Sequence, residues 1–168
     1  FENRTAGKNL GIIFREMRYT SVDKTPAKLK IEINTTEHFS VLDLQHIEHT
    51  VDSEWFKGSG TIITYHLEEL MATKLRALYQ RRKGRDLFDL WFICGRDLVK
   101  IDQVIALFHK YCAHDGLLIS KDLFTNNMNL KSISNDFRVD MDMLLPIQMQ
   151  WDFETAFDFV QRQVIDRC

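Results

Sequence analysis

The sequence of 168 residues contains only three cysteines and two prolines. The cysteines, Cys94, Cys112 and Cys168, form no C-x-x-C pair, which excludes a zinc ribbon. Their small, odd number does not favour a disulfide framework, as is typical of a protein of the reducing cytoplasm. No apolar run approaches the ~18 residues of a membrane-spanning helix, and no charged-then-apolar leader is visible. The sequence therefore predicts a cytoplasmic protein without membrane contact.

A strong excess of charge of either sign is also missing. The 22 Lys and Arg residues stand against 24 Asp and Glu residues, giving a net charge of −2. This balance argues against a surface that is basic throughout, so any contact with nucleic acid or phosphate must come from a local patch. With 45% hydrophobic residues the chain can build one ordinary core, but it is short for two domains of typical size.

The first third of the chain has the patterns of β-strands. Residues 10–19 are rich in β-forming residues, and residues 28–34 alternate strictly, with Leu29, Ile31 and Ile33 on one face. Period-two alternation is typical of a half-buried strand, and the spacing of the two runs predicts a hairpin. Residues 40–51 form a weaker, mixed stretch, and residues 61–65 are a short candidate strand.

From residue 67 onward the hydrophobic period becomes helical. Helices are predicted over residues 67–82, 85–95, 101–114 and 151–165. Residues 120–137 are ambiguous, because three asparagines lower their helix propensity. Strands followed by helices indicate an α+β protein, with an antiparallel or mixed sheet in residues 1–66 and a helical lobe in residues 67–168, together one compact unit.

Lys74 interrupts the apolar stripe of the first predicted helix. Successive helical residues turn by about 100°, which places Lys74 within the arc of Leu67, Leu70, Met71, Leu75 and Leu78. A buried ammonium is costly unless it reaches solvent or meets an anion. The pattern leaves both readings open: a lysine whose stem covers the core, or one that pairs with an anion.

Asp86 and Asp89 occupy one face of the next predicted helix, three residues apart. Two neighbouring carboxylates on a partly apolar face repel each other unless a cation lies between them. Asp86 also suits a simple alternative, a residue in the first helical turn that is favoured by the helix dipole. Asp89 lies further into the helix, and this alternative explains it poorly.

Residues 74–85 carry six basic side chains and no acidic one: Lys74, Arg76, Arg81, Arg82, Lys83 and Arg85. The cluster is either a solvated helix end or a cradle for a triphosphate or an RNA backbone. Glu32 lies on the polar face of the strand at 28–34, where an exposed Glu needs no function.

Three segments of the sequence form a specific combination: KLKIEI at residues 28–33, YHLEELMATKLRAL at 65–78 and RRKGRDLFDLWFI at 81–93. Taken together, they closely resemble the AbiEii/AbiGii family of nucleotidyltransferase-like toxins. The family belongs to the DNA polymerase beta-type nucleotidyltransferase superfamily. The resemblance implies the C-terminal part of a nucleotidyltransferase fold. It also implies transfer of a nucleoside monophosphate from an NTP to an acceptor, with RNA and the tRNA 3′ end as candidates, in toxin–antitoxin or phage defence.

The resemblance also implies roles for individual residues. Glu32 matches the third carboxylate of a site for Mg²⁺ or Mn²⁺, and Lys74 matches a lysine that holds nucleotide phosphates. Asp86 and Asp89 match the family's last motif, with Lys83 and Arg85 beside them as nucleotide-binding residues. Such chemistry needs hard carboxylate ligands for the metal ions and cations for the departing pyrophosphate.

One family motif is missing from its expected place. The family begins with a Gly-Ser pair followed about ten residues later by D-x-D on a strand. The Gly-Ser at 58–59 is followed at that distance only by the acids at 68–69, and the D-x-D at 140–142 lies far downstream. Since the first residue is Phe, we expect the chain to be a truncated and inactive piece. The alternative is a degenerate, non-catalytic module that binds RNA or protein, and a cognate antitoxin is a further expected partner.

Overall fold

The computed structural model describes residues 2–9, 12–35, 38–146 and 148–168. These ranges form strands in the first part and helices in the second, which confirms the α+β fold. The chain divides into two compact units, Phe1–Ser40 and Val41–Cys168, and each is described by itself. The division into a strand-rich part and a helical lobe at residue 66 remains a prediction.

The N-terminal unit contains one antiparallel sheet in the order β1-β2-β3. Its strands are β1 (Glu2–Asn9), β2 (Ile12–Thr20) and β3 (Pro26–Asn34), and Phe14 lies opposite Glu32 in the register of β2 and β3. The predicted hairpin is therefore confirmed. The alternating apolar face of β3 is less covered than predicted, with Ile31 39% and Leu29 52% exposed. The physical reason is that the described part of this unit contains no helix that could cover the sheet.

The C-terminal unit begins with a second hairpin, β4 (Gln45–Asp52) and β5 (Lys57–Thr64), in which Ile47 lies opposite Ile62. The weak pattern at residues 40–51 thus contains a full strand. The Gly-Ser pair at 58–59 lies inside β5, where it pairs with β4 as ordinary extended backbone.

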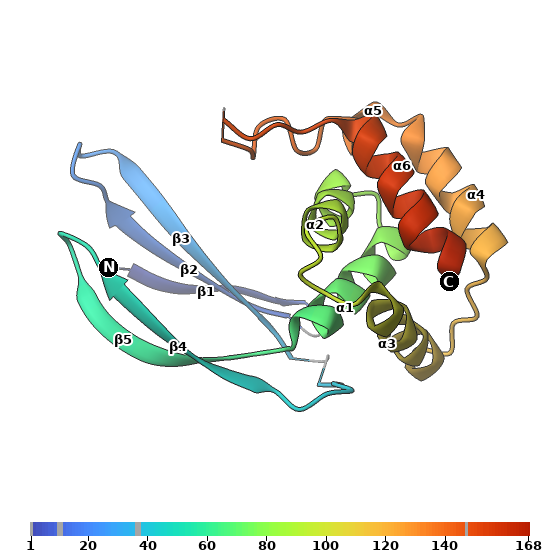
Figure 1. Ribbon diagram of the computed structural model, residues 1–168. Coiled ribbons are helices and arrows are strands. Elements are labelled where there is room, and N and C mark those ends of the chain that lie inside the picture. Colours follow the sequence, from blue (N-terminus) through green and yellow to red (C-terminus); the bar gives the residue numbers. More distant parts are fainter. Residues whose placement is uncertain (1, 10–11, 36–37, 147) are drawn as a thin grey trace. The chain divides into compact units, whose positions relative to one another are not determined.

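The helices that follow match the predicted positions (Figure 1). They are α1 (Leu67–Gln80), α2 (Gly84–Cys94), α3 (Ile101–His114), α4 (Lys121–Ser132), α5 (Asn135–Arg138) and α6 (Phe153–Gln163), followed by the short 3₁₀ helix η1 (Ile165–Arg167). The ambiguous stretch 120–137 resolves into α4 and α5. Ser120 begins α4, because its hydroxyl accepts a hydrogen bond from the Leu123 N–H. No described helix is both long and apolar enough to cross a membrane.

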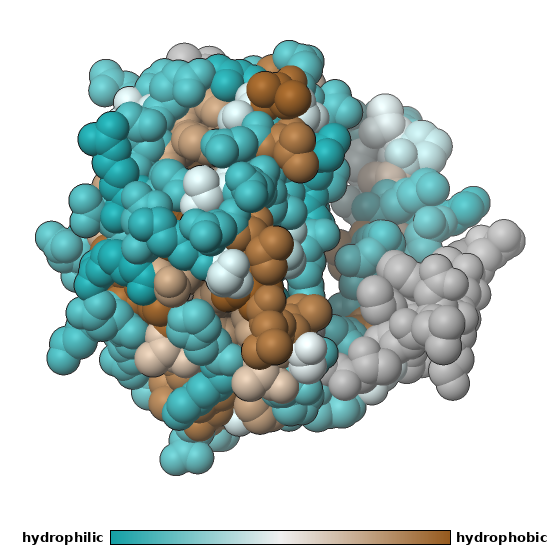
Figure 2. Space-filling view, turned by 90° about the vertical axis from the view of Figure 1, so that its right-hand side faces the viewer, coloured by the Kyte–Doolittle hydropathy of each residue, from teal (hydrophilic) through white to brown (hydrophobic). Residues whose placement is uncertain are grey.

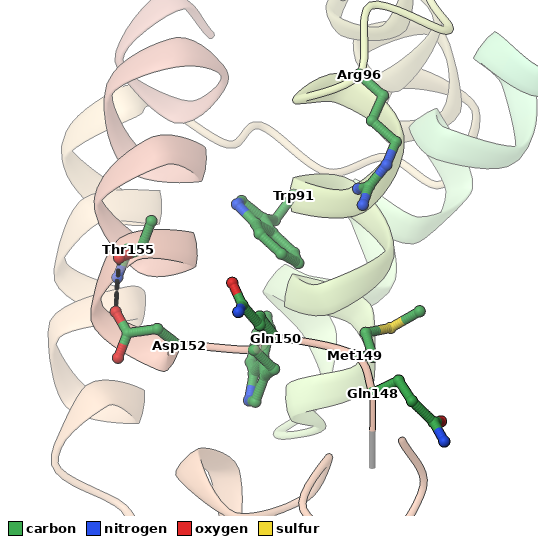
Figure 3. A pocket seen from close by; sticks show the side chains of 8 residues that line it. Trp91, Arg96, Gln148, Met149, Gln150, Asp152 and Thr155 are labelled. Atoms are coloured by element: carbon green, nitrogen blue, oxygen red, sulfur yellow. Dashed lines mark hydrogen bonds between the residues drawn. The ribbon is translucent and has the colours of Figure 1, made fainter. Parts of the chain in front are cut away.

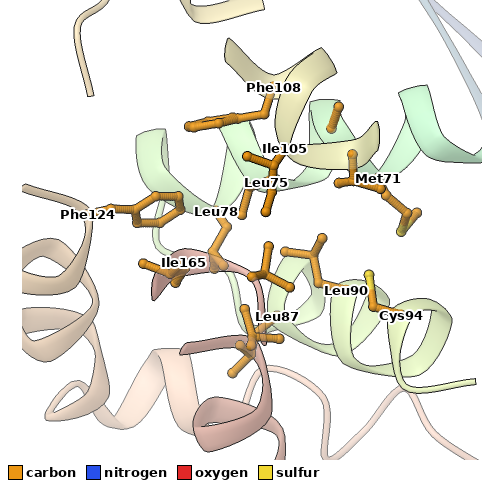
Figure 4. Packing of buried hydrophobic residues seen from close by; sticks show 14 of the residues in the cluster. Met71, Leu75, Leu78, Leu87, Leu90, Cys94, Ile105, Phe108, Phe124 and Ile165 are labelled. Carbon is orange, nitrogen blue, oxygen red and sulfur yellow. The ribbon is translucent and has the colours of Figure 1, made fainter. Parts of the chain in front are cut away.

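The core of this unit lies between the helices (Figure 4). Leu75 of α1, Leu87 of α2, Phe108 of α3, Phe124 of α4 and Ile165 of η1 are fully buried. Burial of one such side chain stabilises a fold by about 1.5–3 kcal/mol, so this cluster holds α1 and α2 together.

Figure 2 shows that hydrophilic residues cover much of the face on the right of Figure 1, with hydrophobic patches between them.

Candidate functional site

Lys74 of α1 meets the acid pair of α2. Its ammonium nitrogen lies 2.7 Å from Oδ2 of Asp89 and 3.6 Å from Oδ1 of Asp86. The buried face of α1 is turned further toward Ala72 than the apolar stripe suggests, so Lys74 stands at its edge with 34% of its side chain exposed. Of the two readings left open by the sequence, the lysine that pairs with an anion is the one observed.

Asp86 is fully buried and is held by a bidentate ion pair. Arg81, the residue after α1, donates from Nε to Oδ2 and from Nη2 to Oδ1 of Asp86, both at 2.7 Å. These hydrogen bonds raise the pKa of the Arg81 guanidinium above its ordinary value. A buried carboxylate requires such partners, because an unpaired charge in the interior is strongly unfavourable. Asp86 lies in the first turn of α2, as the simple alternative expects, and in addition its pairing with Arg81 links α2 to the end of α1.

The N-terminus of α2 is fixed by a residue from far along the chain. Lys83 occupies the cap position without a side-chain capping bond, and Asp140 instead accepts a hydrogen bond of 3.1 Å from the Arg85 N–H. The Lys83 ammonium lies 4.0 Å from Oδ1 of Asp140. A Cβ on Gly84 would lie 2.3 Å from the carbonyl oxygen of Phe137, so only glycine fits at this position. The D-x-D at 140–142 thus contributes a structural carboxylate.

The basic stretch 74–85 does not act as one surface. Arg76 pairs with Asp115 at 2.7 Å, and its guanidinium lies over the Tyr111 ring at 5.0 Å from the centroid. Lys74 and Arg81 point instead to the acids of α2, whereas Lys83 and Arg85 flank the start of that helix with exposed side chains. Arg76 is thus engaged within the protein, and the cradle for a triphosphate or an RNA backbone, one of the two readings of this stretch, stays a prediction.

Glu69 is a buried carboxylate that the sequence analysis missed. Oε1 accepts hydrogen bonds from the Val41 N–H at 2.6 Å and from the Tyr111 hydroxyl at 2.7 Å, and Oε2 accepts one from the Leu42 N–H at 3.1 Å. It thereby ties the chain before β4 to α1 and α3. Burial and the hydrogen bond to Glu69 raise the pKa of Tyr111. The available signal was position: Glu69 precedes Ala72 by three residues and so shares its helix face.

Lys131 of α4 is a second buried charge that was missed. Its ammonium donates to the carbonyl oxygens of Leu78 and, at 2.8 Å, of Tyr79, which lie in the last turn of α1. These are carbonyls that a helix leaves without an internal partner. Burial, with a smaller contribution from Arg82, lowers the pKa of Lys131 to about 8, and Asp86 opposes this shift. Lys131 therefore stabilises the end of α1 next to Arg81.

Glu32 lies in the N-terminal unit, whereas the other candidates lie in the C-terminal one. Its carboxylate is 54% exposed and pairs with Lys30. In the described parts of the chain, no three His, Cys, Asp or Glu side chains form a group that could hold a metal ion. Asp86 and Asp89 already pair with cations of the protein. These residues by themselves do not fit a two-metal centre, although Glu32 has the oxygen ligand that Mg²⁺ or Mn²⁺ prefers.

Comparison with known proteins identifies the family. The family model described as nucleotidyl transferase AbiEii toxin, type IV TA system, matches residues 4–159. No curated protein and no solved structure matches the chain. Because the family model spans most of the sequence, the chain belongs to the AbiEii family of nucleotidyl transferase toxins, which confirms the resemblance seen in its motifs.

Proposed function

We propose, from the membership of this chain in the AbiEii family, that it serves the transfer of a nucleoside monophosphate from an NTP to RNA. The tRNA 3′ end is our candidate acceptor. The family description names a type IV toxin–antitoxin system, so a cognate antitoxin is a proposed partner. NTPs and tRNA are both cytoplasmic, and we place the reaction there.

The position of Lys74 supports this proposal most directly. Two carboxylates of α2 fix its ammonium, and 34% of the side chain still faces solvent. A cation that is already held in place can stabilise phosphate charge without a cost of reorganisation. On our proposal the exposed side of the Lys74 ammonium contacts the NTP phosphates, and Asp86 and Asp89 are positioning residues that act through it.

Lys83 and Arg85 extend the positive charge toward solvent. Lys83 is held loosely by Asp140 at 4.0 Å, and the Arg85 side chain is exposed at the start of α2. We propose that they contact the outer phosphates of the NTP or the backbone of the acceptor, since phosphate contacts fix orientation on nucleic acid. We do not assign Arg81 to this role, because its Nε and Nη2 already donate to the two carboxylate oxygens of Asp86.

A divalent cation would supply charge neutralisation for the leaving pyrophosphate. We propose Glu32 as one ligand to Mg²⁺ or Mn²⁺, on the strength of its match to the family motif alone. The roles of Lys74, Lys83 and Arg85 above do not depend on the metal.

The test is a transfer assay with labelled NTPs, total tRNA and Mg²⁺, on the natural gene product that carries this sequence. We expect Lys74→Ala to lower the transfer rate by about 10²–10³-fold, the usual effect of losing one preorganised donor. Lys110→Ala is the matched control, because Lys110 is exposed on α3. Thermal unfolding of both variants checks that the fold is intact.

Wild-type transfer by a folded Lys74→Ala variant would contradict the role of Lys74. A natural gene product that binds RNA but neither binds nor consumes any NTP would instead support the non-catalytic binding module.

A further inference from the structure

A cavity of about 920 Å³ opens beside α2, and its lining includes none of the residues of the Lys74 ion pairs. It is lined by Trp91 and Arg96, by the segment at 148–152 that leads into α6, and by Thr155 (Figure 3). Trp91 follows Asp89 by two residues and is therefore turned by about 200° around α2. Such a turn separates the cavity from Lys74 by roughly the ~10–12 Å diameter of a helix.

Two of the lining residues, Trp91 and Trp151, belong to an aromatic cluster with Phe88 and Phe92, which pack behind them. The Trp91 and Trp151 rings lie 5.5 Å apart at 67°, and Phe88 contacts Trp151 at 5.3 Å and Phe92 at 5.4 Å. All four side chains are half-buried, so each ring packs against its neighbours and leaves part of its surface open. Rings held in this way form a rigid, preorganised surface for another flat ring.

Arg96 adds a cation to the cavity lining. Its guanidinium lies 3.7 Å from the centroid of Phe92 and 5.8 Å from that of Trp91, and Nη1 donates to the Phe92 carbonyl oxygen at 3.0 Å. Across the described ranges no carboxylate forms an ion pair with Arg96. A guanidinium fixed over an aromatic wall and lacking a carboxylate is suited to a phosphate.

Polar groups on the opposite side complete the lining. Figure 3 shows the amide of Gln150 pointing toward Trp91, where it offers both a donor and an acceptor. Asp152 is engaged at the start of α6, where its Oδ1 accepts from the Thr155 N–H at 2.8 Å and from the Thr155 hydroxyl at 2.6 Å. These bonds lower the pKa of Asp152, which is therefore ionised at neutral pH.

We propose that this cavity binds one nucleotide of the single-stranded RNA acceptor. The base stacks on Trp91 and Trp151, the Gln150 amide bonds to the edge of the base, and Arg96 pairs with the phosphate. The inference rests on the proposed function for the identity of its ligand. Base stacking on aromatic side chains tolerates any sequence, so the cavity selects single-stranded nucleotides without reading a particular base.

The occupant we choose is the acceptor, not the NTP. Lys74 and the cavity lie on different sides of α2, so an NTP whose phosphates contact Lys74 leaves the cavity free for a nucleotide of the acceptor. A peptide could also pack against the aromatic rings, but Arg96, which forms no ion pair with a described carboxylate, favours a ligand with a phosphate.

The experiment measures binding of a fluorescein-labelled eight-nucleotide single-stranded RNA by anisotropy. We expect Trp151→Ala to raise the Kd about 5- to 100-fold, as for the loss of one stacking contact, and Trp151→Phe to retain most of the affinity. Arg96→Ala should weaken RNA binding. It should also reduce the dependence of log Kd on log salt concentration by about the contribution of one phosphate contact. Trp55→Ala is the matched control, because Trp55 is 87% exposed outside the cavity and should leave the Kd unchanged.

Unchanged RNA affinity in folded Trp151→Ala and Arg96→Ala variants would overturn the proposal. Displacement of the RNA by free NTP, with the same dependence on Trp151, would overturn it in favour of a site for the NTP base. The failures of the two proposals can be distinguished. Lys74→Ala should lower the transfer rate by about 10²–10³-fold while leaving the RNA affinity measured by anisotropy unchanged. Trp151→Ala should raise the KM for RNA while leaving the Kd for NTP unchanged. RNA binding that depends on Trp151 in a protein without transfer activity would preserve the cavity and refute only the proposed function.

Discussion

Replacing Glu69 by glutamine changes one atom of a fully buried side chain and removes its charge. The carboxylate accepts three hydrogen bonds, from Val41, Leu42 and Tyr111. In the best arrangement the amide oxygen keeps the place of Oε1, with its bonds to Val41 and Tyr111. The amide nitrogen then faces the Leu42 N–H, which puts two donors against each other.

The expected cost follows from these contacts. Leaving the Leu42 N–H unsatisfied costs about 1–3 kcal/mol, and each of the two remaining bonds loses about 1 kcal/mol because its acceptor is no longer charged. Burying a neutral amide in place of a carboxylate offsets part of this loss. We therefore expect Glu69→Gln to lower the free energy of unfolding by about 2–4 kcal/mol, which is roughly 5–15 °C in Tm for a chain of this size.

The measurement is urea unfolding followed by tryptophan fluorescence, since Trp91 and Trp151 report on the helical unit. Tyr111→Phe removes a single donor and should cost about 1–2 kcal/mol. The double variant should cost less than the sum by about 1 kcal/mol, because the two side chains share one bond. A Glu69→Gln variant within 0.5 kcal/mol of the wild type, or strict additivity with Tyr111→Phe, would refute the reasoning.

Three further outcomes are expected. Gly84→Ala should destabilise the unit by about 1–3 kcal/mol in urea unfolding, because its Cβ would lie 2.3 Å from the Phe137 carbonyl oxygen, whereas Gly60→Ala, with open space around it, should change stability by less than about 0.5 kcal/mol. The pKa of Lys131 is lowered from its ordinary value of 10.5 to about 8 in the folded state, so between these pH values the unfolded chain binds more protons than the folded one. Stability of the wild type relative to Lys131→Met should therefore rise by ~1–3 kcal/mol from pH 8 to 10.5, and a flat difference would contradict the buried-ammonium assignment. Asp89→Asn should lower transfer with little change in Tm, because Asp89 is partly exposed while Asp86 keeps Arg81; an unchanged rate would refute its positioning role.

Asp86 and Asp89 show what helical periodicity can predict about a site and what it cannot. The spacing of Asp86 and Asp89 predicted that both carboxylates lie on one helix face and need a nearby cation. Lys74 is a charged residue within an apolar stripe, which predicted that it needs an anion. Both sides of the ion pair could therefore be predicted from the sequence. The pairing of Arg81 with Asp86 could not be predicted, because Arg81 lies in the short connection between α1 and α2, where no periodicity applies. Its bidentate bond to Asp86 depends on the angle at which the two helices meet.

Local sequence patterns do not predict the partners of the buried charges that stabilise the fold. Glu69 reaches backbone groups 27 and 28 positions earlier, and Lys131 reaches carbonyls 52 and 53 positions earlier. Nothing near either residue in the sequence marks these partners. The aromatic cavity likewise joins Trp91 of α2 to Trp151, two residues before α6.

The sequence by itself determined that strands precede helices, which family the chain belongs to, and that Lys74 and the acids of α2 need partners of opposite charge, because these depend on residue periodicity and on motifs within short windows. Only the tertiary structure decided that Arg81 pairs with Asp86 and that the Glu69 carboxylate is buried and links distant segments. It also decided that Trp91, Trp151 and Arg96 line one cavity. Those features depend on contacts between distant segments, and such contacts form only when the helices pack around their common core.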